Sequence, residues 1–304
     1  MTRPLKIGVQ LPEVEYEYTW PQYAEMARVA EEIGLDSIWV GDHLMYRYAD
    51  PDQKPRGPFE SWTTLSALAA VTEHVQLGHL VASALFHTPP MIAKMAATVD
   101  QISNGRFVLG LGAGWHEPEY KGFGIPYDHR FSRFAEAYQV IRDLLTIGEA
   151  NLDGEYYQIE DALLFPKPVN PDGMPIMIGS YGQKMLELTL PTAEWWNAWS
   201  ADYGGTFEGL EKLLQRIDSV CEQVDRDSST LVKTVAPLIG MSGARGRLSE
   251  YGSPPALEGT DASSLANDLH RFAEMGVAHV QLVLDPINAE TIAALQPVLE
   301  QLGS

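Results

Sequence analysis

The sequence predicts a (β/α)8 barrel, because apolar runs typical of buried parallel strands alternate with amphipathic helical stretches along the chain. The chain has 304 residues, a length that such a barrel often reaches as one domain. A doubly wound sheet is the rival fold, but no Gly-x-Gly-x-x-Gly loop follows the first apolar run. The expected strands are Ile7–Leu11, Ser37–Val40, Val75–Ala82, Phe107–Leu111, Ile176–Ile178, Trp196–Trp199, Leu231–Ile239 and His279–Leu284.

Helical patterns fill the stretches between these runs, and two of them show an apolar face at helical spacing. The two faces are Met91, Ile92, Met95, Val99 and Ile102, and Phe131, Phe134, Tyr138, Ile141 and Leu145. Gly34, Gly105 and Gly276 are expected to end helices before the second, fourth and eighth strands. Asp261, just before another helical stretch, is expected to cap that helix.

Two segments exceed a minimal barrel and are predicted to be insertions at the C-terminal face of the strands. Residues 152–169 are interpreted as a strand pair, Gly154–Ile159 followed by Ala162–Phe165. Residues 240–260 are rich in Gly, Ser, Pro and Arg, and they are a candidate lid. Long insertions in compact domains are usually functional or disordered. We expect residues 1–304 to form one domain that includes both segments.

The composition narrows the class of protein. With 41 acidic against 21 basic residues, the net charge of −20 argues against nucleic acid or an anionic membrane as a partner. The single cysteine, Cys221, allows no internal disulfide, and its apolar helical setting predicts a core residue. No apolar run approaches the roughly 20 residues of a membrane span, and no apolar signal segment opens the chain. These features favour a cytoplasmic enzyme.

Active sites of such barrels lie at the C-terminal ends of the strands, so the residues that follow each strand are the first candidates. They are glycine-rich and aromatic: Gly41–Met45, Leu80–Ser83, Gly112–Glu117, Gly179–Gly182 and Trp195–Trp199. A glycosidase needs two facing carboxylates, whereas Glu117 and Glu119 share one loop. The adjacent Asp42 and His43 suit one metal ligand more than two, so no metal is expected.

Glycine-rich turns suit a large planar cofactor that carries a phosphate, because the backbone can approach closely and its N–H groups can bind the anion. Gly179–Gly182 precedes a helical stretch, which makes it a candidate phosphate site at a helix N-terminus. A plain turn between strand and helix is the alternative interpretation. Arg130 stands at a predicted helix start, against the usual dipole preference, and this position hints at an anion or a carboxylate partner.

Motifs along nearly the whole chain match one known family: Leu35–His43, Pro89–Arg106, Phe107–Tyr120, Gly124–Pro126, Arg130-Phe131, Asp153–Tyr157 and Pro166–Pro168. They resemble the luciferase-like monooxygenase superfamily, and especially its branch that uses the 5-deazaflavin coenzyme F420. The resemblance implies a flavin-type cofactor, a small-molecule substrate and a homodimer. The sugar-phosphate dehydrogenases of this branch carry a glutamate where Trp115 stands here, and this departure argues against a sugar-phosphate substrate.

The same resemblance assigns roles to individual residues. His43, beside Asp42, would be catalytic and face the reactive centre of a ring at the barrel mouth. A non-prolyl cis peptide bond would lie near Leu80-Val81, behind the ring. The residues that would bind the cofactor ring, its ribityl chain and its phosphate are Leu80, Val81, Ala82, Ser83, Gly112, Ala113, Gly114, Gly179, Ser180, Tyr181 and Gly182.

These inferences lead to an F420-dependent oxidoreductase that transfers a hydride between the deazaflavin and a small organic substrate. In this hypothesis His43, with an intrinsic pKa near roughly 6.5, handles the accompanying proton. One alternative is an FMN-dependent monooxygenase that receives electrons from a partner flavin reductase. Another is a non-catalytic flavin-binding barrel. Binding of F420 against FMN distinguishes the first two, and redox turnover distinguishes both from the third.

Overall fold

The computed structural model describes residues 3–48, 52, 54–171, 173–244 and 256–303. The centre of the candidate lid, residues 245–255, lies outside this set. Among the described residues no helix has both the length and the apolar composition needed to cross a membrane.

Parallel strands form a closed eight-stranded barrel, which confirms the predicted fold class. The strand order is β1-β2-β3-β5-β8-β9-β10-β13, and β13 pairs with β1 to close it. All eight predicted strands are present. Their bounds are β1 Lys6–Gln10, β2 Ser37–Val40, β3 Gln76–His79, β5 Phe107–Gly112, β8 Ile176–Gly179, β9 Trp195–Trp199, β10 Val232–Ala236 and β13 His279–Asp285.

Two predicted strands are each divided in two. The third continues after β3 as β4, Ala82–Ser83, and the break coincides with a cis peptide bond between Leu80 and Val81. The seventh continues after β10 as β11, Leu238–Gly240, beyond Pro237. Proline has no backbone N–H to donate, so it interrupts the ladder at this point.

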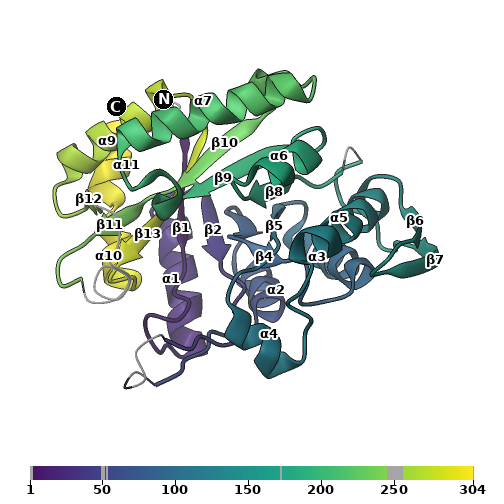
Figure 1. Ribbon diagram of the computed structural model, residues 1–304. Helices are drawn as coiled ribbons and strands as arrows, with labels where there is room; N and C mark the ends of the chain where they lie inside the picture. The colour runs from purple at the N-terminus through teal and green to yellow at the C-terminus, as the bar shows by residue number, and fades with distance from the viewer. Residues whose placement is uncertain (1–2, 49–51, 53, 172, 245–255, 304) are drawn as a thin grey trace. The chain divides into compact units, whose positions relative to one another are not determined.

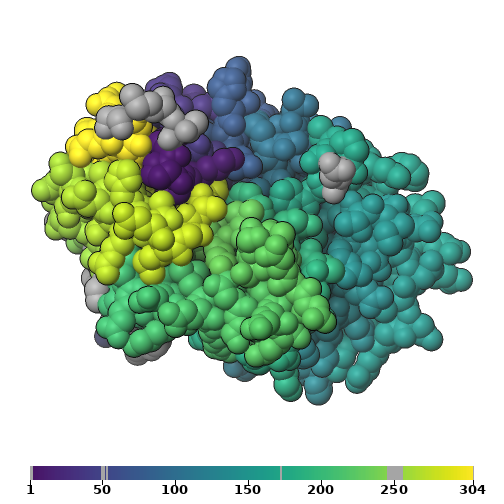
Figure 2. Space-filling model, turned by 90° about the horizontal axis from the view of Figure 1, so that it is seen from above, coloured from purple at the N-terminus to yellow at the C-terminus, as the bar shows by residue number. Residues whose placement is uncertain are grey.

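The chain forms two compact units, which are described separately, and the expectation of a single domain stays a prediction. Unit 1 comprises residues 1–39, 74–76 and 177–304, and unit 2 comprises residues 40–73 and 77–176. In unit 1, α1 packs on α10, α9 on α11 and α6 on α7 (Figure 1). Figure 2 shows the purple N-terminal residues beside the yellow C-terminal segment, in agreement with the β1–β13 pairing. The remaining elements of unit 1 are α1 Trp20–Glu32, α6 Gln183–Thr189, η1 Ser200–Tyr203, α7 Phe207–Gln223, η2 Ser228–Thr230, β12 Leu257–Glu258, α9 Ala262–Glu274, α10 Ala289–Ala293 and α11 Gln296–Leu302.

Unit 2 carries helices α2 to α5 and one antiparallel hairpin. Helix α3 packs against both α2 and α5, and the hairpin packs on α5 through β6. The bounds are α2 Ser61–Val71, α3 Pro89–Ser103, α4 Glu117–Phe123, α5 Arg130–Thr146, β6 Glu149–Asp153 and β7 Gln158–Leu163.

The predicted helix ends are confirmed. Gly34, Gly105 and Gly276 all adopt positive φ angles, of 83°, 82° and 85°, a conformation that glycine reaches without steric cost. The Asp261 side chain accepts the N–H groups of Ser263 and Ser264, which would otherwise have no partner at the start of α9. Cys221 is buried in α7, as expected.

Both predicted helix faces were partly wrong. In α5, Phe131 is 39% exposed, whereas the other four predicted residues are buried. In α3, Ile92 and Val99 are buried, but Met91 is 50% exposed and Ile102 is 45% exposed. The buried side of α3 is formed largely by small residues, Ala93, Ala96 and Ala97. Alanines let a helix lie close to its neighbours, so α3 packs through its alanines and leaves Met91 and Ile102 exposed.

The hairpin also differs from its prediction. Gly154–Ile159 was expected to be a strand, but Gly154–Tyr157 forms the turn, and the first strand starts earlier, at Glu149. The reason lies outside the segment: the carboxylate of Glu136 on α5 accepts the N–H groups of residues 155, 156 and 157. A side chain from the preceding helix therefore supplies the acceptor that a strand partner would have supplied.

Candidate functional site

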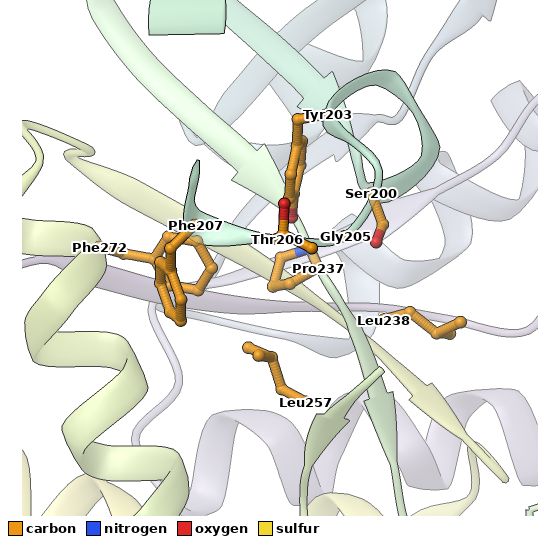
Figure 3. Close-up of a pocket in the computed structure, with 9 residues that line it drawn as sticks. All are labelled: Ser200, Tyr203, Gly205, Thr206, Phe207, Pro237, Leu238, Leu257 and Phe272. Carbon is orange, nitrogen blue, oxygen red and sulfur yellow. The ribbon is translucent and has the colours of Figure 1, made fainter. Parts of the chain in front are cut away.

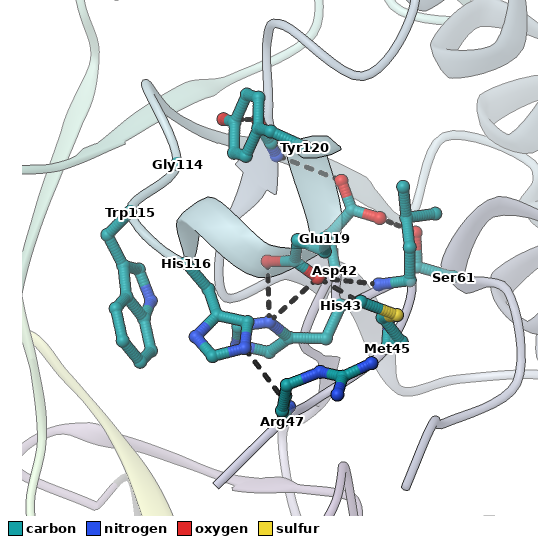
Figure 4. Close-up of polar contacts among 12 residues, drawn as sticks. Asp42, His43, Met45, Arg47, Ser61, Gly114, Trp115, His116, Glu119 and Tyr120 are labelled. Atoms are coloured by element: carbon teal, nitrogen blue, oxygen red, sulfur yellow. Dashed lines mark hydrogen bonds and ion pairs between the residues drawn. The ribbon is translucent and has the colours of Figure 1, made fainter. Parts of the chain in front are cut away.

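Asp42, directly after β2 in unit 2, is buried and holds two other segments in place (Figure 4). Its Oδ1 accepts a hydrogen bond from Ser61 Oγ at 2.8 Å, and its Oδ2 accepts the Ser83 N–H at 2.9 Å. Burial raises the pKa of this carboxyl to about 6, although both hydrogen bonds act in the opposite direction. Asp42 thus ties the loop after β2 to the start of α2 and to β4.

His43, the next residue, has a different acidic partner. Its Nδ1 lies 3.1 Å and 3.3 Å from the two carboxylate oxygens of Glu119. Glu119 comes from the first turn of α4 and is 1% exposed. The same carboxylate accepts the N–H of Leu44 at 2.9 Å, so one buried side chain fixes both the imidazole and the backbone that follows it.

Three aromatic rings surround the imidazole of His43. Tyr46, Trp115 and His116 all meet it edge to face, with ring centroids 5.6, 5.8 and 6.2 Å away. Tyr46 and His116 also stack on each other at 4.4 Å. His116 Nε2 accepts the Arg47 N–H, so the neutral form of this ring carries its proton on Nδ1. Burial lowers the pKa of His116, which favours the neutral form.

Strands β4 and β5 bring two predicted cofactor-binding segments together. The non-prolyl cis peptide bond expected near Leu80-Val81 is present between these residues. Ala82 and Ser83 pair with Leu111 and Gly112. The hydroxyl of Tyr120 donates to the Ala113 carbonyl at 2.9 Å and lies 2.8 Å from Ser83 Oγ. Burial raises the pKa of Tyr120 to about 12, which keeps this donor protonated.

The loop from Ala113 to Trp115 is fastened by its carbonyl groups. Besides Tyr120, Arg130 donates to the Gly114 carbonyl at 2.6 Å, and Tyr127 donates to the Trp115 carbonyl at 2.9 Å. The guanidinium of Arg130 also lies 4.4 Å from the centre of the Tyr127 ring. Arg130 therefore contacts a backbone carbonyl and an aromatic face, and the anion partner expected for it stays a prediction.

Gly114 is explained by this local packing. Its φ is 67°, and a Cβ at this position would lie 1.9 Å from the Tyr120 hydroxyl oxygen. A Cβ would force the buried Tyr120 side chain to move, so local packing favours glycine here whether or not a ligand lies nearby.

The predicted phosphate site, Gly179–Gly182, belongs to unit 1 and is much less braced. Trp196 Nε1 donates to the Ser180 carbonyl at 2.8 Å, and the Gly182 carbonyl accepts the N–H of Leu186. Tyr181 is 47% exposed. Since Gly182 is the N-cap of α6, the N–H groups of the first helical turn have no acceptor inside the helix.

The predicted site residues thus fall into two groups. Asp42, His43, Leu80–Ser83 and Gly112–Gly114 come together in unit 2, while Gly179–Gly182 lies in unit 1. Glu119 and Tyr120 were missed as partners of the site. The signal available in the sequence was an acidic and an aromatic residue directly after Pro118, near the start of a helix. The helix has only seven residues, so its periodicity does not show which of its faces is buried.

A small cavity and a surface hollow are both lined by residues of unit 1, and neither lining includes a predicted site residue. Figure 3 shows the cavity, whose volume of about 10 Å³ is roughly that of one water molecule. Its lining is Ser200, Tyr203, Gly205, Thr206, Phe207, Pro237, Leu238, Leu257 and Phe272. The hollow, of about 810 Å³, lies over Arg3 and Lys6, at the N-terminal end of β1. Within the described part of the chain, no three His, Cys, Asp or Glu side chains are grouped to hold a metal ion.

Comparison with known proteins gives relatives with two kinds of activity. An uncharacterized protein of Mycobacterium bovis is 28% identical over 284 residues, which are 89% of this chain and 90% of that one. The F420-dependent glucose-6-phosphate dehydrogenase of Amycolatopsis mediterranei is 35% identical over 52% of this chain and 47% of its own. The pyrimidine monooxygenase RutA of Pantoea ananatis is 34% identical over 54% and 49%.

Solved structures show the same fold. An F420-dependent secondary alcohol dehydrogenase, in complex with an F420-acetone adduct, matches 98% of this chain and 99% of its own with a TM-score of 0.79 at 18% identity. The monooxygenase RslO1 of Streptomyces bottropensis matches 99% and 100%, again with a TM-score of 0.79, at 17% identity. Residues 6–241 match the family described as luciferase-like monooxygenase, and the chain belongs to this family.

Proposed function

We propose that the protein is an F420-dependent oxidoreductase that transfers a hydride between the deazaflavin and a small organic substrate. The observation that carries the proposal is the setting of His43: its imidazole follows a barrel strand, is held by a buried carboxylate and is enclosed by aromatic rings. The F420-dependent dehydrogenase among the sequence relatives supports the same cofactor.

The chemistry of the residues fits a flavin-type group. Trp115, next to His43, is 57% exposed and offers an aromatic face to a planar ring. The first turn of α6 offers backbone N–H donors suited to a phosphate. A Cβ at Gly182 would meet only Ser180 Oγ, at 3.9 Å, so the approach to that turn is open in unit 1.

When bound, the deazaflavin supplies a ring carbon that accepts or donates a hydride. The chain supplies a proton carrier and its orientation. With Nδ1–H directed at Glu119, neutral His43 keeps the lone pair on Nε2, the atom that would take a proton from a substrate hydroxyl or return it. Asp42 is committed to Ser61 and Ser83, so its role in this proposal changes from a catalytic group to a positioning residue.

Cofactor titration tests the proposal. Oxidised F420 and, separately, FMN are added to purified protein, and quenching of its seven tryptophans is followed. Tight binding of F420 with weak binding of FMN is the expected result. A clear preference for FMN would overturn the F420 assignment.

The second candidate function is an FMN-dependent monooxygenase that works with a partner flavin reductase. The observation in its favour is the similarity to the pyrimidine monooxygenase RutA. Oxygen consumption measured with reduced FMN and an added reductase separates the two candidates, because the F420-dependent reaction consumes no oxygen.

A further inference from the structure

We propose that Glu119 is the positioning residue that fixes the ring orientation and the tautomer of His43. The inference rests on the proposed function in one respect: that function makes His43 the residue that transfers a proton. The geometry itself belongs to unit 2 and to the free protein.

The carboxylate of Glu119 has little freedom to do anything else. Its side chain is 2% exposed, and its hydrogen-bond donors are the His43 ring and the N–H groups of Leu44 and Met45, at 2.9 and 3.5 Å. A buried carboxylate is costly unless such donors satisfy it. The position of Glu119 is therefore tied to the loop that carries His43.

The helix that carries Glu119 is itself held against this loop. A Cβ at Gly122 of α4 would lie 2.9 Å from the Met45 methyl carbon. The Met45 side chain therefore packs directly against the α4 backbone at Gly122. Tyr120, the neighbour of Glu119, is anchored by Ser83 and the Ala113 carbonyl. Glu119 thus approaches His43 from a fixed support rather than from a mobile loop.

This arrangement selects one of two possible ring orientations. Rotating the His43 ring by about 180° would put a C–H group, in place of Nδ1–H, against the carboxylate. The neutral ring that Glu119 holds carries its proton on Nδ1, because a carboxylate accepts but does not donate. The lone pair then lies on Nε2. The acid adjacent in sequence, Asp42, is directed elsewhere: its two oxygens accept the Ser61 hydroxyl and the Ser83 N–H.

The substitution Glu119→Gln is the sharpest test, because the amide has the same shape. Its oxygen can keep the Leu44 N–H, and its NH2 group then faces His43 Nδ1. A donor at this position requires the lone pair on Nδ1, so the ring proton moves to Nε2. Glu117→Gln is the matched control, since it makes the same change on an exposed face of α4, where Glu117 pairs with Lys121.

The readout is the ring ¹⁵N spectrum of cofactor-free protein labelled in its eight histidines, recorded above the pH at which His43 titrates. His43→Gln identifies the His43 signals by their loss. We expect the Nδ1–H tautomer in the wild type and in E117Q, and the Nε2–H tautomer in E119Q. An Nε2–H tautomer in the wild type overturns the proposal even if E119Q does not fold, as does an unchanged tautomer in folded E119Q.

Turnover and cofactor affinity complete the test. In E119Q, kcat should fall about 10²- to 10⁴-fold, the range for general acid–base groups, while the cofactor Kd changes by less than about threefold. E117Q should match the wild type in both. The tautomer result stands whichever cofactor binds, so a failure of the F420 assignment and a failure of the Glu119 proposal are distinguishable.

Discussion

The segments after β2 and after β8 both follow barrel strands, yet they are built in opposite ways. In Gly41–Met45, side chains and backbone are bonded to α2, β4 and α4 through Asp42 and Glu119. In Gly179–Gly182 the turn is partly exposed, and the first N–H groups of α6 have no acceptor within the helix. A proton-transfer group needs a fixed orientation, whereas an anion site needs unpaired donors. The contrast matches the roles proposed for the two segments.

The largest effect on turnover should come from removing the imidazole of His43, which the segment Gly41–Met45 carries. His43→Ala is expected to lower kcat about 10²- to 10⁴-fold, because a positioned acid–base group contributes that much. The cofactor Kd should change by less than about threefold. Steady-state kinetics and titration check both values, with His270→Gln, an exposed histidine on α9, as the control. Unchanged turnover would remove His43 from the mechanism.

A pair of glycine substitutions compares the two segments directly. Gly114→Ala should lower the free energy of unfolding by about 2–4 kcal/mol, because φ is positive and the new Cβ would collide with Tyr120. Gly182→Ala has an ordinary φ of −70° and open space, so it should cost below about 1 kcal/mol. Denaturant unfolding measures both. Equal losses would contradict the contrast between a braced and an open segment.

Asp42→Ala tests whether that residue positions others or reacts itself. The substitution leaves the Ser61 hydroxyl and the Ser83 N–H buried without their acceptor, so the free energy of unfolding should fall by about 2–3 kcal/mol. Thermal or denaturant unfolding provides the value. Loss of turnover at unchanged stability would instead mean that Asp42 touches the reacting atoms.

The last prediction concerns pH and His79, which contacts the Ser61 hydroxyl that Asp42 accepts. His79, whose Nε2 lies 3.1 Å from Ser61 Oγ, is fully buried, and burial lowers its pKa from 6.5 to about 3. Because the folded protein holds His79 neutral, this residue stabilises the fold at pH values above 6.5, its pKa in the unfolded chain. The stabilisation is lost as the pH falls from 6.5 toward 3.

The stability of the wild type relative to His79→Gln should therefore decline below pH 6.5, by about 1 kcal/mol per pH unit. Asp42 and Asp202, whose pKa values burial raises to about 6, act in the opposite direction in both proteins, so taking the difference between the proteins removes their shared contribution. Unfolding curves at several pH values measure this difference. A difference that does not change with pH would show that His79 takes up a proton as readily in the folded protein as in the unfolded protein.

The local predictions succeeded where a short stretch of sequence carries its own cause. The glycines at 34, 105 and 276 end helices because no other residue reaches that backbone conformation so readily. Asp261 caps α9 because its acceptor lies within three residues of the orphan donors. The hairpin prediction failed because its cause lies outside the segment: Glu136 on α5 decided the turn at Gly154–Tyr157.

The sequence by itself determined the barrel, the order of its strands and the loops that carry the candidate site, because apolar periodicity and helix-ending residues act over a few positions. Only the tertiary structure decided which carboxylate serves His43. Asp42 is adjacent in the chain and Glu119 is 76 residues away, yet Glu119 makes the contact. Hydrogen bonds between side chains depend on distance and direction in space, and the packing of α4 sets both.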